Sequence, residues 1–142
     1  LTESVLIQNT DRNLQIIEEL KRLGVSIAID DFGVGYSSLS YLNRFSLDAL
    51  KIDQSFVKNI GINDIDEMII RTIIGLAQKL NMHVIAEGIE TPEQLAFIQA
   101  EQCDEVQGYL VGHPMLADQF VEQIWKRDLQ GQTLLSHLQK FT

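Results

Sequence analysis

Polar side chains end each of four short apolar segments of this sequence. In chain order they are Asp30 with Asp31, Lys51 with Asp53, Glu87 with Glu90, and Gln107. In parallel α/β folds, the active site forms where the carboxyl ends of neighbouring strands meet. The positions of these residues therefore predict one polar site at the carboxyl end of a parallel sheet.

The adjacent pair Asp30-Asp31 is the sharpest local feature. Two neighbouring carboxylates repel each other, so their placement together favours a bound cation or good solvation. In two-metal sites the ions lie about 3.5–4 Å apart, and a bridging carboxylate with a neighbour can serve both ions. The alternative is a solvated turn after a strand, which is the commoner explanation for an Asp-Asp pair taken alone.

Three further polar residues each allow a functional and a structural interpretation. Lys51 could orient a water or neutralise a phosphate oxygen, or its stem could pack while its ammonium reaches solvent. Glu87 could be a metal ligand or a base, or it could form a salt bridge with Lys51. For Gln107 alone, an amide that packs or caps a helix is the default interpretation.

Hydrophobic spacing predicts that helices alternate with strands along the chain. The expected strands are 25–30, 47–53, 83–88 and 103–109, and the expected helices are 10–23, 55–59, 64–80, one that begins at Pro92 after a Thr91 cap, and 117–129. This order favours a parallel sheet with crossover helices, either an open doubly wound layer or part of a barrel. Since a full (β/α)8 barrel takes about 250 residues, four units would be about half of one.

The bulk composition excludes several classes of protein. The chain has 142 residues, a net charge of −9 and one cysteine, Cys103. A single cysteine excludes an internal disulfide and a cysteine-based metal site, and it fits a reducing, cytoplasmic location. No run of about 18 apolar residues is present, and no cluster of Lys and Arg offers a surface for duplex DNA or RNA. An acidic chain can still bind a phosphodiester if metal ions screen the charge.

Five segments together resemble the EAL-domain family of cyclic di-GMP phosphodiesterases. They are LTES from Leu1, DDFGVGYSSLSYL from Asp30, LKIDQSFV from Leu50, IAEGIET from Ile85 and QGYLVGHP from Gln107. They occur in the family's order and with fitting spacing over residues 1–120. The resemblance implies an α/β fold that forms the C-terminal half of a TIM-like (β/α)8 barrel. It places a partial EAL domain at 1–125 and a helical tail at 126–142.

The resemblance also implies roles for the matching side chains. Asp30, Asp31 and Glu87 are similar to the family's metal-binding carboxylates, with Asp30 as the bridging ligand. Lys51 and Glu87 resemble the catalytic residues, namely the lysine beside the attacking water and the carboxylate that can act as a base.

Substrate, cofactors and partners follow from the same resemblance. Gln107 resembles the substrate-binding glutamine, and Glu3 resembles the glutamate that anchors the loop after the aspartate pair. The implied cofactors are two Mg²⁺ or Mn²⁺ ions, and the implied reaction converts cyclic di-GMP to linear pGpG. Sensory or GGDEF-type domains are expected in the parent protein. A homodimer is also expected, because a half barrel would leave the strands at 25–30 and 103–109 as open edges.

The chain departs from the family pattern in three respects, of which the replacement of a usual threonine by Val34 is mild. The Glu-Ala-Leu motif, a metal-binding asparagine and a further glutamate are absent from its 142 residues, so the isolated chain is expected to be inactive. Gly112 and His113 replace a usual serine–lysine pair, which could weaken a contact to a substrate phosphate. The alternative function is a degenerate EAL domain that acts as a nucleotide-binding or protein-interaction module.

Overall fold

The computed structural model describes residues 1–2, 5, 10–35, 42 and 44–122. The chain divides into two compact units, Leu1–Val111 and Gly112–Thr142. In the second unit, residues 117–122 are helical, which is the beginning of the helix expected at 117–129. Glu3, residues 36–41 and the tail expected at 126–142 lie outside the described residues. None of the described helices is long and apolar enough to cross a membrane.

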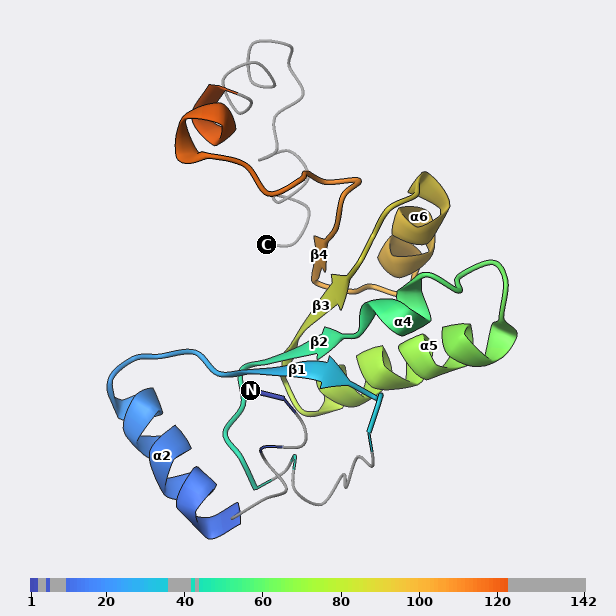
Figure 1. The fold of residues 1–142 in the computed structure, drawn as a ribbon. Coiled ribbons are helices and arrows are strands. Elements are labelled where there is room, and N and C mark those ends of the chain that lie inside the picture. Colours follow the sequence, from blue (N-terminus) through green and yellow to red (C-terminus); the bar gives the residue numbers. More distant parts are fainter. Residues whose placement is uncertain (3–4, 6–9, 36–41, 43, 123–142) are drawn as a thin grey trace. The chain divides into compact units, whose positions relative to one another are not determined.

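The first unit is built on a four-stranded parallel sheet (Figure 1). The strands are β1 (Ala28–Phe32), β2 (Ala49–Ile52), β3 (His83–Glu87) and β4 (Glu105–Gln107), and they pair in that order. All four strands lie within the segments expected from the sequence, except that β1 continues two residues further. Their carboxyl ends therefore meet at one end of the sheet, as the sequence predicted.

The outer side of β1 is partly paired by the first two residues of the chain. Thr2 forms an isolated parallel bridge with Asp30, whose N–H donates to the Leu1 carbonyl at 2.7 Å. The Leu1 amino group donates to the Ala28 carbonyl at 2.9 Å. β1 and β4 are the outermost of the four strands, as expected, but the expectation of an open edge at β1 is wrong in part. The homodimer stays a prediction.

The sheet has one apolar face and one mixed face, because side chains alternate along each strand. The apolar face includes the fully buried side chains of Ile29, Leu50, Ile52, Val84 and Ala86. The mixed face is half-buried and includes Ala28, Asp30, Ala49, Lys51, Ile85 and Glu87. This alternation explains how two site residues, Lys51 and Glu87, extend from strands whose other side chains form the core.

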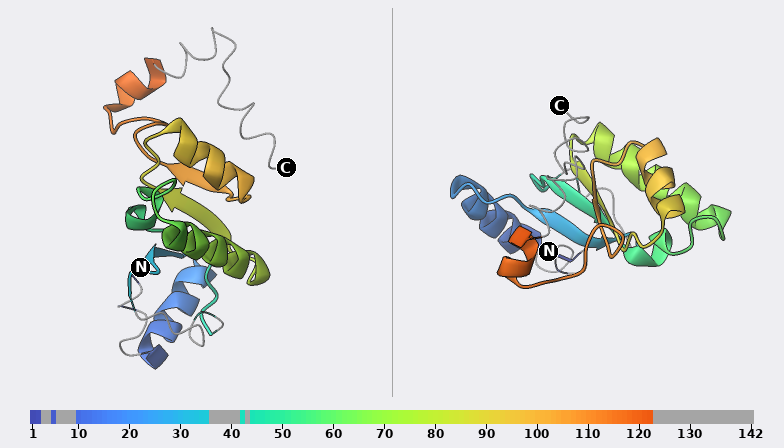
Figure 2. Two further views of the ribbon diagram at one scale, coloured as in Figure 1. Left: turned by 90° about the vertical axis from the view of Figure 1, so that its right-hand side faces the viewer. Right: turned by 90° about the horizontal axis from the view of Figure 1, so that it is seen from above.

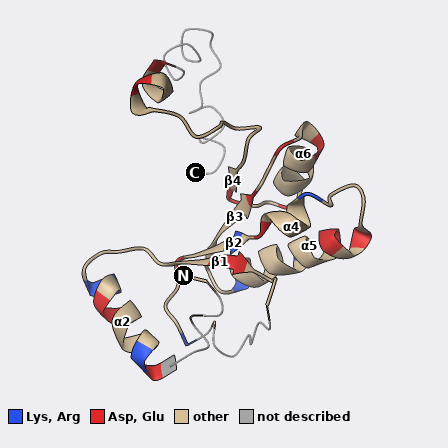
Figure 3. Cartoon of the chain, viewed as in Figure 1, with Lys and Arg blue, Asp and Glu red and all other residues tan. Residues whose placement is uncertain are grey.

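Among the described helices of the first unit, one precedes β1 in the chain, and three others connect β2 to β3 and β3 to β4. They are α2 (Thr10–Arg22), α4 (Gln54–Val57), α5 (Asp64–Lys79) and α6 (Pro92–Ala100). The helix α5 contacts β2 and β3 and contributes buried isoleucines to their core. Figure 2 shows α5 and α6 on the same side of the sheet. Acidic residues in the first turn of α5 and basic residues in the last turn of α2 (Figure 3) complement the helix dipoles.

The helix ends follow the capping signals in the sequence. Asn63 caps α5 by accepting the main-chain N–H two residues further on at 3.0 Å. Thr91 and Gln94 form a capping box at the start of α6, with Pro92 in its first turn. Gly24 ends α2 with a left-handed φ of 81°. Each of these three boundaries confirms a sequence-based prediction.

An ion pair connects α2 to the segment that enters β2. Lys21 pairs with one oxygen of Asp48, whose other oxygen accepts the Ile27 N–H at 2.7 Å. The hydrogen bond from Lys21 and then that from Ile27 hold the pKa of Asp48 below its usual value, against the opposing effect of burial. Asp48 therefore stabilises the folded state in its ionised form.

We predict that Asp48→Asn lowers the free energy of unfolding by about 0.5–1 kcal/mol near neutral pH, since the pair is about one-third exposed and screened. The amide still accepts the Ile27 N–H, so the change isolates the charge. Because the folded-state pKa is depressed, the contribution is present above about pH 4 and is lost as the pH falls through the folded-state pKa. Urea unfolding curves of the two proteins should converge on acidification.

The matched control for this prediction is Glu18→Gln, which removes a carboxylate that is 63% exposed and pairs with Arg22 on the same helix. It should change the stability less than Asp48→Asn does. A gap between wild type and Asp48→Asn that persists unchanged down to about pH 2.5 would show that the charge of Asp48 is not its source.

Candidate active site

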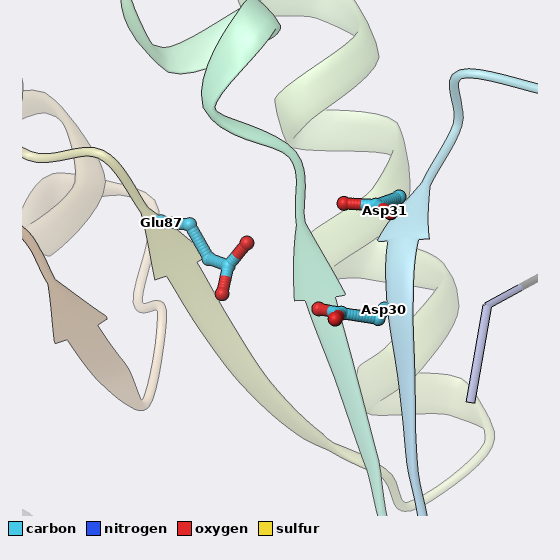
Figure 4. Close-up of side chains that lie close together, drawn as sticks. All are labelled: Asp30, Asp31 and Glu87. Carbon is cyan, nitrogen blue, oxygen red and sulfur yellow. The ribbon is translucent and has the colours of Figure 1, made fainter.

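Three carboxylates converge at the carboxyl end of the sheet. Asp30, Asp31 and Glu87 each offer an oxygen atom, and these oxygens all lie within 4.8 Å of one another. Asp30 and Glu87 are half-buried, whereas Asp31 is exposed. Figure 4 shows the two aspartates on β1 and Glu87 on β3, with their side chains extending toward one another across β2. The structure thus brings together the three residues proposed as metal ligands from the sequence.

A β-bulge allows both aspartates to reach this site. In the pairing of β1 with β2, Ile29 lies opposite Leu50 and Phe32 lies opposite Ile52, so two residues on β1 face one residue on β2. The extra residue is accommodated where Asp31 adopts a left-handed φ of 55°, which aspartate tolerates better than most residues. In a regular strand, consecutive side chains would point to opposite faces. The bulge therefore explains how neighbouring carboxylates can act at one site.

The Lys51 ammonium lies between the carboxylates of the two flanking strands. Its Nζ donates to Asp30 Oδ1 at 2.8 Å and also forms an ion pair with Glu87. The alternative interpretation, in which the ammonium of Lys51 simply reaches solvent, is wrong, since the side chain is only 23% exposed and doubly paired. The salt bridge proposed as the structural interpretation of Glu87 is present, and the same carboxylate also lies in the cluster.

These contacts favour the charged forms of Asp30 and Lys51. The hydrogen bond from Lys51 holds the pKa of Asp30 below its usual value, although burial opposes this shift. Burial by itself would lower the pKa of Lys51, but its hydrogen bonds to Asp30 and Glu87 outweigh this effect and raise it. At neutral pH the cluster therefore combines an ionised Asp30 with a charged ammonium.

The donor set fits a hard divalent cation. Three carboxylates and one ammonium have a formal charge of −2, and carboxylate oxygens are the ligands that Mg²⁺, Mn²⁺ and Ca²⁺ prefer. The site also lies at the end of a parallel sheet, where metal-assisted chemistry is commonly built. The residues present can hold a cation and place an ammonium beside it.

The remaining strand-end residues have different surroundings. Gln107 is the register partner of Glu87, is exposed, and stands one strand further from the aspartates. Asp53 caps α4 by accepting the Ser55 N–H at 2.9 Å, so its role is structural. The main-chain N–H of Glu90 donates to the side chain of Gln94 at 2.8 Å, within the start of α6.

Sequence reasoning did not single out the two glycines that directly follow Glu87 and Gln107. Gly88 has a left-handed φ of 73°, and a side chain on Gly108 would overlap the main chain of Ile89. A glycine immediately after each functional strand end is the sequence signal for such a close approach of two main chains.

Comparison with known proteins identifies the family of this chain. The sequence model of the EAL domain matches residues 1–114. The chain is 51% identical over 115 residues to the cyclic di-GMP phosphodiesterase NbdA of Pseudomonas aeruginosa, a match that covers 81% of this chain and 15% of NbdA. It is 41% identical over 124 residues to the bifunctional diguanylate cyclase/cyclic di-GMP phosphodiesterase MucR of the same species, covering 87% of this chain and 18% of MucR.

Solved structures agree with these matches. The c-di-GMP complex of PaMucR phosphodiesterase superposes with a TM-score of 0.81 at 42% identity, covering 84% of this chain and 49% of that chain. A manganese/cy-diGMP complex of Klebsiella pneumoniae BlrP1 gives a TM-score of 0.71 at 36% identity, covering 77% and 28%. This chain therefore spans half or less of each of these relatives.

The expected fold class is confirmed by these relatives and by the all-parallel sheet: an α/β fold that forms half of a TIM-like barrel. The match of the EAL-domain model to residues 1–114, together with identities of 41–51% to curated phosphodiesterases, shows that the chain belongs to the EAL-domain family.

Proposed function

We propose that this chain is the C-terminal half of a metal-dependent phosphodiesterase domain that hydrolyses cyclic di-GMP to linear pGpG. The observation that carries the proposal is the cluster of Asp30, Asp31 and Glu87, with the Lys51 ammonium paired to Asp30 and Glu87. Support for the substrate comes from relatives named as cyclic di-GMP phosphodiesterases and from a relative solved with c-di-GMP. Support for the cofactor comes from a relative solved with manganese and the cyclic dinucleotide.

Asp30, Asp31 and Glu87 would hold the cations, with Asp30 as the bridging ligand. Bound Mg²⁺ or Mn²⁺ would supply charge stabilisation at the phosphate and an activated water. A net charge of −9 would otherwise disfavour binding of a phosphodiester, so a cation at this cluster gives the acidic chain a means of attracting its substrate.

The protein side chains would stabilise charge, transfer a proton and bind the substrate. Lys51 keeps the carboxylate of Asp30 ionised and in place, and its ammonium would neutralise charge that develops on a phosphate oxygen. Glu87 would accept a proton from the attacking water as the water oxygen bonds to phosphorus, and the ester oxygen that is released would take up a proton to become a hydroxyl group of the linear product. Gln107, on the adjacent strand, would contact the substrate. Glu3 would anchor the loop that follows the aspartate pair.

The proposal extends to the parent protein. A GGDEF-type or sensory domain would accompany this chain in its parent, since the relative MucR is named as both a diguanylate cyclase and a phosphodiesterase. In the parent domain, the Glu-Ala-Leu motif of the family would supply further metal ligands beside Asp30, Asp31 and Glu87.

We predict that the 142-residue chain binds Mn²⁺ and that Asp30→Asn and Glu87→Gln each weaken this binding at least about 10-fold. Removing a direct ligand should cost at least as much as removing an outer-shell partner, which typically costs about 10–100-fold. Electron paramagnetic resonance titration of free Mn²⁺ gives the dissociation constants. Asp64→Asn, which removes an exposed carboxylate in the first turn of α5, is the matched control and should leave the affinity unchanged. Equal affinities in all four proteins would rule out the cluster as the cation site.

We predict that Lys51→Ala and Glu87→Ala in the intact parent each lower turnover of cyclic di-GMP by at least ~100-fold at saturating Mn²⁺, the usual loss for one positioned catalytic group. The isolated chain, assayed alongside, should show no turnover. Wild-type rates in both variants would show that Lys51 and Glu87 have a structural role and take no part in catalysis. Binding of cyclic di-GMP by the parent without any hydrolysis would instead favour a regulatory module.

A further inference from the structure

The main chain of Ile89 is held by the segment that follows β4. The Ile89 N–H donates to the Gln107 carbonyl at 3.1 Å, and the Ile89 carbonyl accepts the Leu110 N–H at 3.0 Å. The Ile89 side chain is fully buried in the core. Both polar groups and the side chain of this residue are therefore engaged, two residues after Glu87, so the end of β3 is fixed relative to the end of β4.

Gly108 is required for this contact. A Cβ atom at position 108 would lie 2.1 Å from the Ile89 oxygen and 2.3 Å from the Ile89 nitrogen. Both atoms belong to the main chain, so no flexible side chain could move aside. Ordinary van der Waals contact begins at 3.4 Å, so any side chain would force the two segments more than 1 Å apart. That separation would break the two hydrogen bonds of Ile89.

Gly88 is required for a second contact, on the other side of β3. Its left-handed φ of 73° disfavours other residues, and a Cβ atom there would lie 2.5 Å from Gln54 Cβ and 3.3 Å from Gln54 Cα. Gln54 begins α4, three residues after Lys51. Gly88 thus lets the end of β3 lie directly against the segment that leaves β2.

We propose that Gly88 and Gly108 are positioning residues that set where β3 presents Glu87, relative to Lys51 on one side and Gln107 on the other. Gly88 directly follows Glu87, and Gly108 directly follows Gln107. Their contacts are with main-chain atoms of Ile89 and with Cα and Cβ of Gln54, none of which can move aside by a side-chain rotation. The inference rests on the proposed function, because it treats Lys51, Glu87 and Gln107 as parts of one site. Displacements of about 1 Å are enough to impair a catalytic site on the order of 100-fold.

The two contacts predict different outcomes for the two variants. Gly88→Ala should displace Glu87 from Lys51, whereas Gly108→Ala should displace Gln107, because β4 is a short outer strand and can move more easily than β3. The matched control is Gly75→Ala within α5, where an added Cβ would meet no heavy atom within 4 Å and alanine favours the helix.

The test is nuclear magnetic resonance of the isotopically labelled full chain without metal. Gly88→Ala should shift the Glu87 side-chain carboxylate ¹³C resonance. Gly108→Ala should shift the Gln107 side-chain amide resonances and accelerate hydrogen exchange of the Ile89 and Leu110 amides at least ~10-fold. Gly75→Ala should change none of these. Folded variants in which the Glu87 and Gln107 resonances stay at their wild-type positions would overturn the proposal.

A second variant tests the steric origin of the effect. It also keeps the proposal testable if Gly88→Ala folds poorly. Gln54→Gly removes the Cβ atom that an alanine at position 88 would meet. In the double variant Gly88→Ala with Gln54→Gly, the Glu87 resonance should return to its position in Gln54→Gly alone. A resonance that stays displaced would contradict the contact with Gln54 as the means of positioning.

Titration with Mn²⁺ separates this inference from the proposed function. Gly88→Ala should weaken Mn²⁺ binding at least ~10-fold, and Gly75→Ala should not. If the wild-type chain binds no Mn²⁺ while the Glu87 and Gln107 resonances respond as expected, the proposed function fails and the positioning role stands. If the wild type binds Mn²⁺ and both variants keep its affinity and its resonances, the positioning role fails alone.

Discussion

The Lys51 ammonium makes the convergence of carboxylates possible. Two unit charges 4 Å apart repel by about 1 kcal/mol in water and about 4 kcal/mol near a protein surface, so a cluster of this kind opposes folding unless a positive charge lies within it. Lys51 extends from the central strand β2 and pairs with Asp30 on β1 and with Glu87 on β3. One side chain thus connects three strands at the end where chemistry is expected. A cation that enters the site must share these carboxylates with the ammonium.

The β-bulge is the second constraint on the site. It inserts an extra acidic residue into β1 without turning the apolar side chains outward, since Ile29 and Phe32 on either side of it both remain buried. The same strand therefore serves the core and supplies two carboxylates at its carboxyl end. The cost is a left-handed backbone conformation at Asp31, a residue type that tolerates it.

Much of the fold could be predicted because its signals are local. Thr91-Pro92 and Asn63 mark helix starts through capping chemistry, and the polar residues at strand ends follow from the geometry of parallel sheets. The bulge could not be predicted, because period-two alternation carries no information where a strand ends in two polar residues. The pairing of Thr2 with Asp30 on β1 could not be predicted either, because it joins residues far apart in the sequence. The capping role of Asp53 is local, since its side chain accepts the N–H of Ser55, but its place at a strand end favoured a functional interpretation instead.

The sequence predicted that several polar residues lie together at the end of the sheet, but it did not predict the contacts that hold them there. Residue type and strand-end position made Asp30, Asp31, Lys51 and Glu87 candidates, and the resemblance to the EAL-domain family implied their roles. The need for Gly88 and Gly108 follows from close contacts of the segments after β3 and β4 with each other and with the start of α4. Roles for the proposed residues depend on cation binding, which is the central claim. A crystal of this chain soaked in Mn²⁺ and measured near the manganese absorption edge tests that claim directly. We expect an anomalous peak within coordination distance of Asp30, Asp31 and Glu87, whereas manganese peaks elsewhere and none at this cluster would contradict it.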